Sequence, residues 1–433
     1  MLALLITLSV VLCVALAVGL HVAVVLGFSA VLTGELFSSR SLLDAMGTIP
    51  WNQISNINLV ALPLFILMGE LLLGSGASEG MYNGLTKWLN RLPGGLLHTN
   101  ILASAIFACI SGSSAATAAT VGGVAMPVLR RNGYGNAISL GSLAAGGTLG
   151  ILIPPSIVMI VYGVLSETSI GQLYMSGIVP GVLLTVMFMV VIIVWSMFRP
   201  EIAPKALSST WKEKIIALLS LLPLIVLMFL VLGTIYLGIA TPTEAAALGV
   251  VGSLIIAAWN RKVNREMLRK TCLSTAGTVS MIVLILMGAS ILSFVASYLG
   301  IPAAITAWIT EKGVTAMQFV LMVIVVFLLL ASVMESLSLV VLVVPVIVPV
   351  LKTLHVDLVW FGIVLVLVVE VALITPPVGF NLFIMQGIAN KVTVGDQGKH
   401  SDVFMGSLPF VFAIFLVLAL LLLAPGTVWL LKV

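Results

Sequence analysis

Charged residues are scarce in this chain. Asp, Glu, Lys and Arg make up 8% of the 433 residues, and 61% of the residues are hydrophobic. An ordinary soluble protein has about 25% charged residues, so a soluble globular domain is excluded. The apolar runs are long and continuous rather than alternating, which argues against a β-barrel. We therefore expect an all-α polytopic membrane protein that lies in the lipid bilayer.

Cysteine and histidine are also scarce. The three cysteines, Cys13, Cys109 and Cys272, show no paired spacing, and the four histidines show no metal-ligand spacing, so neither a disulfide nor a zinc site is expected. The chain contains no nucleophile elbow, zinc-protease motif or phosphate loop, and we do not expect an enzyme. The net charge of +4 reflects the loops and gives no reason to expect a nucleic-acid partner.

Two polar stretches interrupt the apolar pattern. Ser111–Gly123 (SGSSAATAATVGG) and Gly146–Ser156 (GGTLGILIPPS) lie between runs that are long enough to enter a bilayer. Hydrocarbon tolerates free backbone carbonyls only where protein or a wet cavity surrounds them. These helix breaks therefore indicate a site at membrane depth.

The same breaks recur in the second half of the chain. Three prolines return 222 residues later: Pro127, Pro154 and Pro155 correspond to Pro349, Pro376 and Pro377. Ser113-Ser114 falls on Glu335-Ser336 at the same offset. Broken helices in corresponding positions of two halves are typical of secondary transporters built from inverted repeats.

Each half is predicted to contain a re-entrant hairpin followed by a Pro-Pro-broken helix. The hairpins are Gly94–Leu129 and Met317–Leu351, and the broken helices are Asn136–Leu165 and Leu358–Gly387. A surface helix precedes each hairpin, at Ala77–Leu92 and Ile301–Lys312. The N-terminal segment Met1–Thr33 is expected to form two short helices, and a helix at Thr278–Tyr298 to match the one at Asn56–Leu73.

The basic residues predict an orientation. If a hairpin counts as no crossing, each half crosses the membrane an odd number of times, and the second copy is inverted. All but four of the 19 Lys and Arg residues then face one side, the exceptions being Arg40, Lys312, Lys352 and Lys432. By the positive-inside rule the basic side is the cytoplasm, and both termini face outward.

Hairpin tips and helix breaks supply carbonyl and hydroxyl oxygens that suit Na⁺, and helix N-termini suit a carboxylate. One predicted Na⁺ site combines Ser111, Gly112 and Ser113 with Gly150 and Pro154, and the second combines Met334, Glu335 and Ser336 with Thr375, Pro376 and Gly379. The substrate would lie between the tips, near Ser113, Ser114, Thr117, Thr148, Ser156, Ser336 and Asn381. The alternative is that Gly and Ser only permit close helix packing.

Four acidic residues have more than one interpretation. Glu335 either takes part in cation binding or satisfies the free amides of the following helix start. Glu70 and Glu370 lie in apolar runs and are interpreted as structural hydrogen-bonding residues rather than proton carriers. Glu244 is interpreted as an acidic residue in the first turn of a helix. Because no Lys or Arg lies near either tip, an anionic substrate would depend on helix ends, hydroxyls and bound Na⁺.

At these motifs the chain resembles the large membrane subunit of tripartite ATP-independent periplasmic (TRAP) transporters, the DctM-like family of the ion-transporter superfamily. The resemblance covers nearly the whole chain. It rests on Ser111–Thr117 (SGSSAAT), Leu149–Ser156 (LGILIPPS), Gly177–Gly181 (GIVPG), Thr241–Ala245 (TPTEA) and Ile374–Gly379 (ITPPVG).

The resemblance implies a subunit of a Na⁺-coupled importer in the bacterial inner membrane, with two or more Na⁺ sites, both termini periplasmic and no organic cofactor. Its partners would be a small four-helix membrane subunit and a periplasmic binding protein. The substrate would be an organic acid: a C4-dicarboxylate, which the motifs slightly favour, another small carboxylate or sulfonate, or sialic acid. Many relatives carry Asp at the position of Glu335. A stand-alone Na⁺- or H⁺-coupled anion carrier or exchanger remains the alternative.

The resemblance also implies elevator motion, in which a transport domain slides past a scaffold. The expected regions are the first scaffold helices and arm (1–92), the first hairpin and broken helix (93–166), further scaffold helices, a cytoplasmic linker and a second arm (167–312), the second hairpin and broken helix (313–391), and a C-terminal scaffold helix (392–433).

Overall fold

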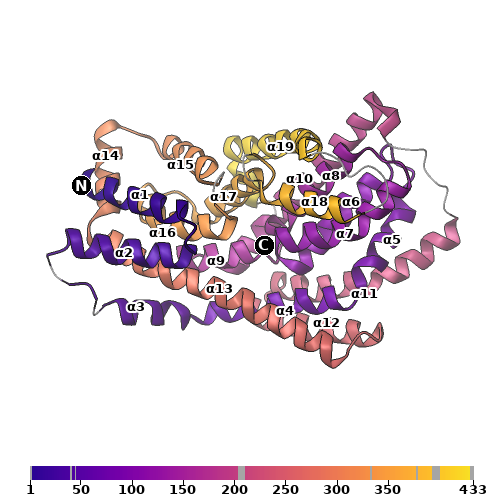
Figure 1. The fold of residues 1–433 in the computed structure, drawn as a ribbon, viewed down its shortest axis with the longest axis horizontal. Helices are drawn as coiled ribbons and strands as arrows, with labels where there is room; N and C mark the ends of the chain where they lie inside the picture. Colours follow the sequence, from indigo (N-terminus) through magenta and orange to yellow (C-terminus); the bar gives the residue numbers. More distant parts are fainter. Residues whose placement is uncertain are drawn as a thin grey trace.

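The computed structural model describes residues 2–39, 41–43, 45–202, 210–331, 334–376, 379–392 and 400–429. Every regular element in these ranges is a helix, and Figure 1 shows them as one elongated assembly. Eight helical segments of the described chain are long and apolar enough to cross a membrane. The all-helical membrane architecture expected from composition is confirmed.

The first half contains α1 (Leu2–Ala17), α2 (Val22–Phe37), α3 (Ala45–Ile54), η1 (Ile57–Val60), α4 (Ala61–Gly74), α5 (Ala77–Leu89), α6 (Leu96–Ser111), α7 (Ser114–Arg131), α8 (Asn136–Leu152), α9 (Ile157–Ser166) and α10 (Ile170–Phe198). The second half contains η2 (Pro200–Ile202), α11 (Trp211–Tyr236), α12 (Pro242–Trp259), α13 (Arg265–Tyr298), α14 (Ile301–Lys312), α15 (Ala316–Ala331), α16 (Ser336–Thr353), α17 (Leu358–Leu373), α18 (Phe380–Lys391), α19 (His400–Leu423) and η3 (Pro425–Trp429).

Both hairpins and both broken helices form where the sequence predicts them. The N-terminal run is two helices, α1 and α2, divided near Gly19, whose φ of +82° ends the first. One boundary was wrong: α13 begins at Arg265 instead of Thr278, because Asn264 caps it by accepting a hydrogen bond from the Met267 amide at 2.7 Å. The sequence analysis predicts a loop for the basic residues at the start of α13.

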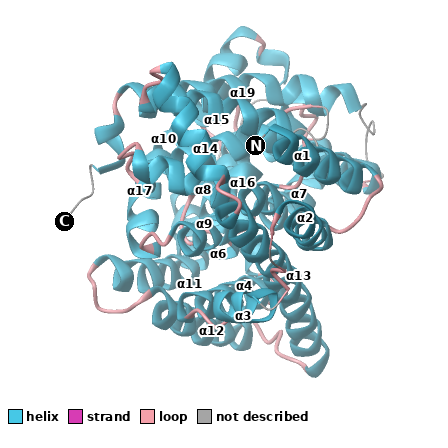
Figure 2. Cartoon of the chain, turned by 90° about the vertical axis from the view of Figure 1, so that its left-hand side faces the viewer, coloured by secondary structure: helices cyan, strands magenta, loops and turns pink. Residues whose placement is uncertain are grey.

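One group of helices packs together beside the hairpins and touches them where α4 meets α6 and α13 meets α16. α2 packs along α13, α4 packs along α12, and α11 packs against α5 and α12. Figures 1 and 2 both show α3, α4, α12 and α13 together at one side of the molecule. These are helices that the sequence assigns to the scaffold, and the surface helix α5 joins them to the first hairpin through α6.

The hairpins and broken helices form the second group. Hairpin helices α6 and α7 pack against α8, and α15 and α16 pack against α17. The halves also exchange contacts, since α7 packs against α18 and α16 packs against α9. This reciprocal pairing brings both hairpins and both broken helices into a single core.

Two helices expected in the scaffold lie against this core. α10 and α19 both pack against α8 and α17. At the crossing of α8 and α19, Gly141 meets the Gly406 backbone so closely that neither position has room for a side-chain carbon. The structure thus attaches both helices to the broken helices, and the division into moving and fixed parts stays a prediction.

Candidate functional site

The first hairpin turns at Gly112, whose φ of +59° ends α6 in the left-handed region that glycine tolerates. Ser113 then caps α7, because its hydroxyl accepts a hydrogen bond from the Ala116 amide at 3.4 Å. The Ser111 and Thr117 hydroxyls are 2.7 Å apart, and Thr117 donates to the Ser113 carbonyl at 2.8 Å. The tip therefore gathers two hydroxyls and a carbonyl in one place.

This tip contacts the break between α8 and α9. The Ile157 amide donates to the Gly112 carbonyl at 3.1 Å. A side-chain carbon at Gly150 would come within 2.6 Å of the Ser113 carbonyl oxygen and 2.7 Å of the Thr117 hydroxyl. The structure thus brings together the first tip and the first break, and a side chain at position 150 would occupy the space among their oxygens.

These oxygens fit a hard monovalent cation. Carbonyl and hydroxyl oxygens at helix breaks are the usual Na⁺ ligands of discontinuous membrane helices. The hydroxyls of Ser111 and Thr117 can rotate their hydrogens away and offer lone pairs to an ion. Pro154 carries no amide hydrogen, so it cannot donate the usual helical hydrogen bond to the carbonyl four residues earlier, at Gly150.

At the second tip, Glu335 caps α16. Its carboxylate accepts hydrogen bonds from the Ser336 hydroxyl at 2.9 Å, the Ser338 amide at 3.3 Å and the Ser338 hydroxyl at 3.4 Å. The capping role considered for Glu335 is confirmed. Its part in cation binding stays a prediction, because a carboxylate that accepts three hydrogen bonds still has lone pairs for an ion.

The second break lies between α17 and α18. The Thr375 hydroxyl donates to the Val371 carbonyl at 2.6 Å, and Gly379 precedes α18 with a φ of +50°. Pro376 is exposed, whereas Pro377 lies outside the described residues. The second tip borders this region through Leu373 and Phe380, which flank the break on either side.

A small cavity separates the two tips. It has a volume of about 50 Å³, enough for a few water molecules. Its wall combines Gly112–Ala115 of the first tip, Glu335–Leu337 of the second tip, Ile151, Ile157 and Val158 beside the first break, and Leu373 and Phe380 beside the second. A neighbouring cavity of about 140 Å³ lies between the second tip and α17. Residues from both hairpin tips and from beside both helix breaks therefore border one cavity.

Comparison with known proteins identifies the family. A sequence model described as the DctM component of the tripartite ATP-independent periplasmic transporter matches residues 9–427. The chain belongs to the DctM family. The resemblance seen in the sequence motifs is confirmed, and this DctM protein is a transporter subunit rather than an enzyme.

Relatives of this DctM protein include the large permease protein DctM of a C4-dicarboxylate TRAP transporter from Pseudomonas aeruginosa, 35% identical over 84% of this chain and 84% of that protein. The isethionate TRAP transporter permease protein DctMQ of Oleidesulfovibrio alaskensis is 33% identical over 87% of this chain and 59% of that protein. The crystal structure of the YdaH transporter of Alcanivorax borkumensis, 16% identical, covers 95% of this chain and 98% of its own with a TM-score of 0.64. This last likeness is one of fold alone.

The polar residues predicted to contact substrate divide into two sets. Ser113, Ser114 and Ser336 border the cavity. The remaining four, Thr117, Thr148, Ser156 and Asn381, are fully buried. Their polar atoms bond within the protein, as where Thr148 donates to the Ala145 carbonyl at 2.7 Å. Substrate contact for either set stays a prediction.

Asn381 links the halves of the molecule. Its amide nitrogen donates to the Ser114 hydroxyl at 2.8 Å and to the Ala144 carbonyl at 3.0 Å. The Ser114 hydroxyl also lies 3.0 Å from the Asn381 amide oxygen. The start of α18 is thus bonded to the first hairpin and to α8.

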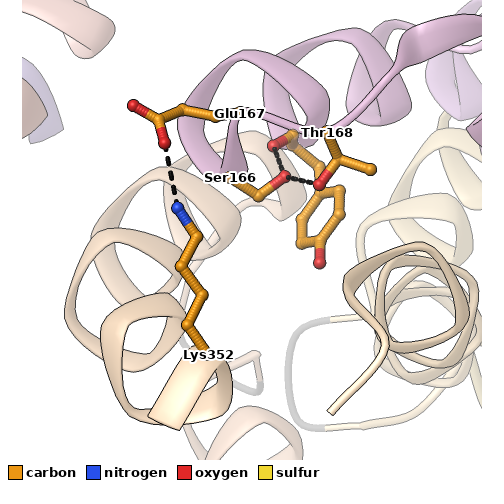
Figure 3. Close-up of polar contacts among 5 residues, drawn as sticks. Ser166, Glu167, Thr168 and Lys352 are labelled. Atoms are coloured by element: carbon orange, nitrogen blue, oxygen red, sulfur yellow. Dashed lines mark hydrogen bonds and ion pairs between the residues drawn. The ribbon is translucent and has the colours of Figure 1, made fainter. Parts of the chain in front are cut away.

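Two cations join the hairpins to the opposite broken helices. Arg130, at the end of α7, donates to the carbonyls of Ala389 and Val392 at 3.0 and 2.6 Å. Lys352, at the end of α16, forms an ion pair with Glu167 at 2.9 Å (Figure 3). Arg130 and Lys352 are 222 residues apart, as are Glu167 and Ala389. The sequence analysis did not predict these two contacts, which we call clamps. The repeat offset could have pointed to them, because it relates the two cations to each other and their partners Glu167 and Ala389 to each other.

The other acidic residues show mixed outcomes. Glu70 accepts a hydrogen bond from the Ser274 hydroxyl at 2.8 Å, and Glu244 forms a capping box with Thr241, as expected. The expectation for Glu370 was wrong, because neither of its carboxyl oxygens has a hydrogen-bond partner in the described structure. Its side chain lies among the apolar residues of α17 and its neighbours, where donors are few.

Proposed function

We propose that this DctM protein is the large membrane subunit of a Na⁺-coupled importer of small organic acids that works by an elevator mechanism. The observation that carries the proposal is the meeting of two hairpin tips and the residues beside two helix breaks around one small cavity. A channel needs a continuous path, whereas two tips that close one point from opposite halves suit alternating access.

Na⁺ binding is proposed at both breaks. The first site would use oxygens of Ser111, Ser113 and the Gly150–Pro154 break, and the second those of the Met334–Ser336 tip and the Thr375–Gly379 break. No Lys or Arg borders the cavity among the described residues. Bound Na⁺ and helix N-termini would therefore supply the positive field that a carboxylate substrate needs.

The reciprocal contacts support an inverted repeat. The second hairpin helix of each half packs on the second part of the other half's broken helix, and a cation clamps each pairing. This arrangement suits a transport domain that moves as one body past α2–α4 and α11–α13. The charge distribution supports cytoplasmic entry of the first hairpin and periplasmic termini.

The partners and substrate class are inferred from relatives. We infer that a small membrane subunit and a periplasmic binding protein complete the transporter. The substrate would be a C4-dicarboxylate or another small carboxylate or sulfonate, since the relatives include C4-dicarboxylate and isethionate TRAP permeases. Sialic acid is less favoured because the tip motifs are closer to dicarboxylate-type members.

Uptake of labelled organic acids into proteoliposomes tests the proposal. The vesicles would contain this chain and its small subunit, with and without an inward Na⁺ gradient and with and without the binding protein. Uptake that needs both is expected. Uptake that needs Na⁺ alone would favour a stand-alone carrier, and uptake driven only by a proton gradient would contradict the Na⁺ sites.

A further inference from the structure

Glu370 lies in the last turn of α17, and its carboxyl has no assigned role. Its side chain is 0% exposed, and in the described structure neither oxygen has a hydrogen-bond partner. Most buried polar groups in proteins are paired, and an ionisable group at membrane depth indicates function by default. The position is equivalent to Thr148, one turn before the first helix break, at the repeat offset of 222 residues.

Two hydrogen bonds define how α19 lies along α17. The Trp360 indole donates to the Leu421 carbonyl at 3.1 Å, and the Ser407 hydroxyl donates to the Ile374 carbonyl at 3.3 Å. The same number of residues separates the two contacts on each helix, so the helices run antiparallel in a fixed register. In that register, Glu370 of α17 lies opposite residues 410–414 of α19, which are all apolar.

No charge on the neighbouring helices lies in the middle of a span. α17 packs against α8, α9, α10, α15, α16, α18, α19 and η3. In the described parts of these helices and their caps, the charged residues lie at helix ends: Glu167 after α9, Arg199 after α10, Glu335 and Lys352 at the ends of α16, Lys391 at the end of α18 and Asp402 at the start of α19.

Two tyrosines on these helices have other contacts. Tyr162 on α9 donates its hydroxyl to the Leu358 carbonyl at the start of α17. Tyr174 on α10 packs its ring against Phe65 of α4, and its hydroxyl has no hydrogen-bond partner in the described structure. Both Glu370 oxygens are unpartnered there as well, so the two side chains do not bond to each other. Among the described residues, an ionised Glu370 would therefore have neither a counter-charge nor a hydrogen-bond donor, and such a carboxylate is strongly disfavoured. The neutral acid needs no counter-charge.

A cavity borders the same turn of α17 that carries this carboxyl, although Glu370 itself does not line it. The cavity of about 140 Å³ between α17 and the second tip is bordered by Val369 and Leu373, which flank Glu370 in the helix, and by Glu335 and Ser336. Movement of the second hairpin away from α17 would widen this cavity next to Glu370. Water could then accept a proton from the acid and hydrate the carboxylate that is left.

We propose that Glu370 is a proton-binding site, which holds a proton in this closed conformation and releases it to water when the second hairpin opens. The opening step rests on the proposed transport function, whereas proton binding in the closed state does not. Because the closed state binds the extra proton, a rise in pH favours the open state and slows closure. Uptake should therefore fall as pH rises.

Infrared difference spectroscopy of the reconstituted protein tests proton binding without any transport. The wild type should show the carbonyl band of a protonated carboxylic acid, which E370Q should lack and which should disappear from the wild type at alkaline pH. E70Q is the matched control, because Glu70 is already paired with Ser274. A spectrum in which E370Q loses no such band would overturn the proposal, even if uptake fails in every sample.

Uptake measured across a pH series tests the release step. E370Q, which cannot release a proton, should lose the decline at high pH that the wild type and E70Q show. If E370Q and wild type keep the same pH profile, release is not linked to opening, and the acid is only a buried structural group. Loss of uptake in wild type at every pH would count against the proposed function and leave the infrared result intact.

Discussion

At the residue scale, serine hydroxyls from both hairpin tips border the central cavity. Ser113 and Ser336 border it from opposite hairpins. We expect S113A combined with S336A to weaken the apparent Na⁺ affinity of uptake about tenfold, since each lost hydrogen-bonding group contributes roughly 0.5–1.5 kcal/mol and about 1.4 kcal/mol is a factor of ten. The Na⁺ concentration that gives half-maximal uptake measures the effect.

The matched control is S104A. Ser104 lies on α6 of the same hairpin, and its buried hydroxyl has no hydrogen-bond partner in the described structure. This variant should keep the wild-type Na⁺ dependence. An unchanged Na⁺ dependence in the double variant would remove both tips from the Na⁺ assignment.

Gly150 is the second residue on which the first site depends. Its missing side chain lets α8 approach the Ser113 carbonyl, where a methyl group would come within 2.6 Å. We expect G150A to lower the free energy of unfolding by about 1–3 kcal/mol, as overpacking does, and to weaken Na⁺ stabilisation. Thermal unfolding with Na⁺ and with K⁺ measures both the loss of stability and the loss of Na⁺ stabilisation.

G123A is the control for G150A, because a methyl group at position 123 meets nothing within 4 Å. Equal effects of the two variants would contradict a role specific to Gly150.

At the scale of helices, the two clamps are equivalent in position but differ in strength. Arg130 is buried and bonds to backbone carbonyls, whereas the side chains of Lys352 and Glu167 are 48% and 79% exposed. An exposed ion pair contributes about 0.2–1 kcal/mol, and each hydrogen bond of a charged group contributes roughly 1.5–3 kcal/mol. We expect R130M to lower the melting temperature far more than K352M does. Similar losses would show that the Arg130 contacts contribute no more to the hairpin attachment than the Lys352–Glu167 ion pair does.

The helices themselves could largely be predicted from the sequence. Proline, glycine and hydroxyl residues act locally, so the breaks at Ser111–Ser114 and Pro154 fix the helix ends with little help from tertiary contacts. The start of α13 was missed because a single cap, Asn264, extends a polar helix beyond the apolar run. Hydrophobicity alone marks where a helix can enter the membrane and does not mark where it begins.

Contacts between distant segments could not be predicted in the same way. The bond from Asn381 to Ser114 and the close crossing of Gly141 and Gly406 depend on how whole helices approach each other. Neither residue pair has a local sequence signal, since Gly and Asn are common throughout the chain. The unpaired state of Glu370 could not be predicted either, because it depends on which side chains of the described helices pack around it.

At the scale of the whole molecule, orientation decides how the two hairpins can alternate. In the orientation that we propose from the charge distribution, the end of the first hairpin lies in the cytoplasm and the end of the second arm helix lies outside. Arg131 ends α7 and Lys312 ends α14, and both are exposed. In a chain whose native cysteines are replaced, we expect K312C to react with a membrane-impermeant maleimide on intact spheroplasts and R131C to react only after permeabilisation. Labelling of both positions from the same side would contradict the inverted arrangement, and with it a mechanism in which each hairpin closes the site from its own face of the membrane.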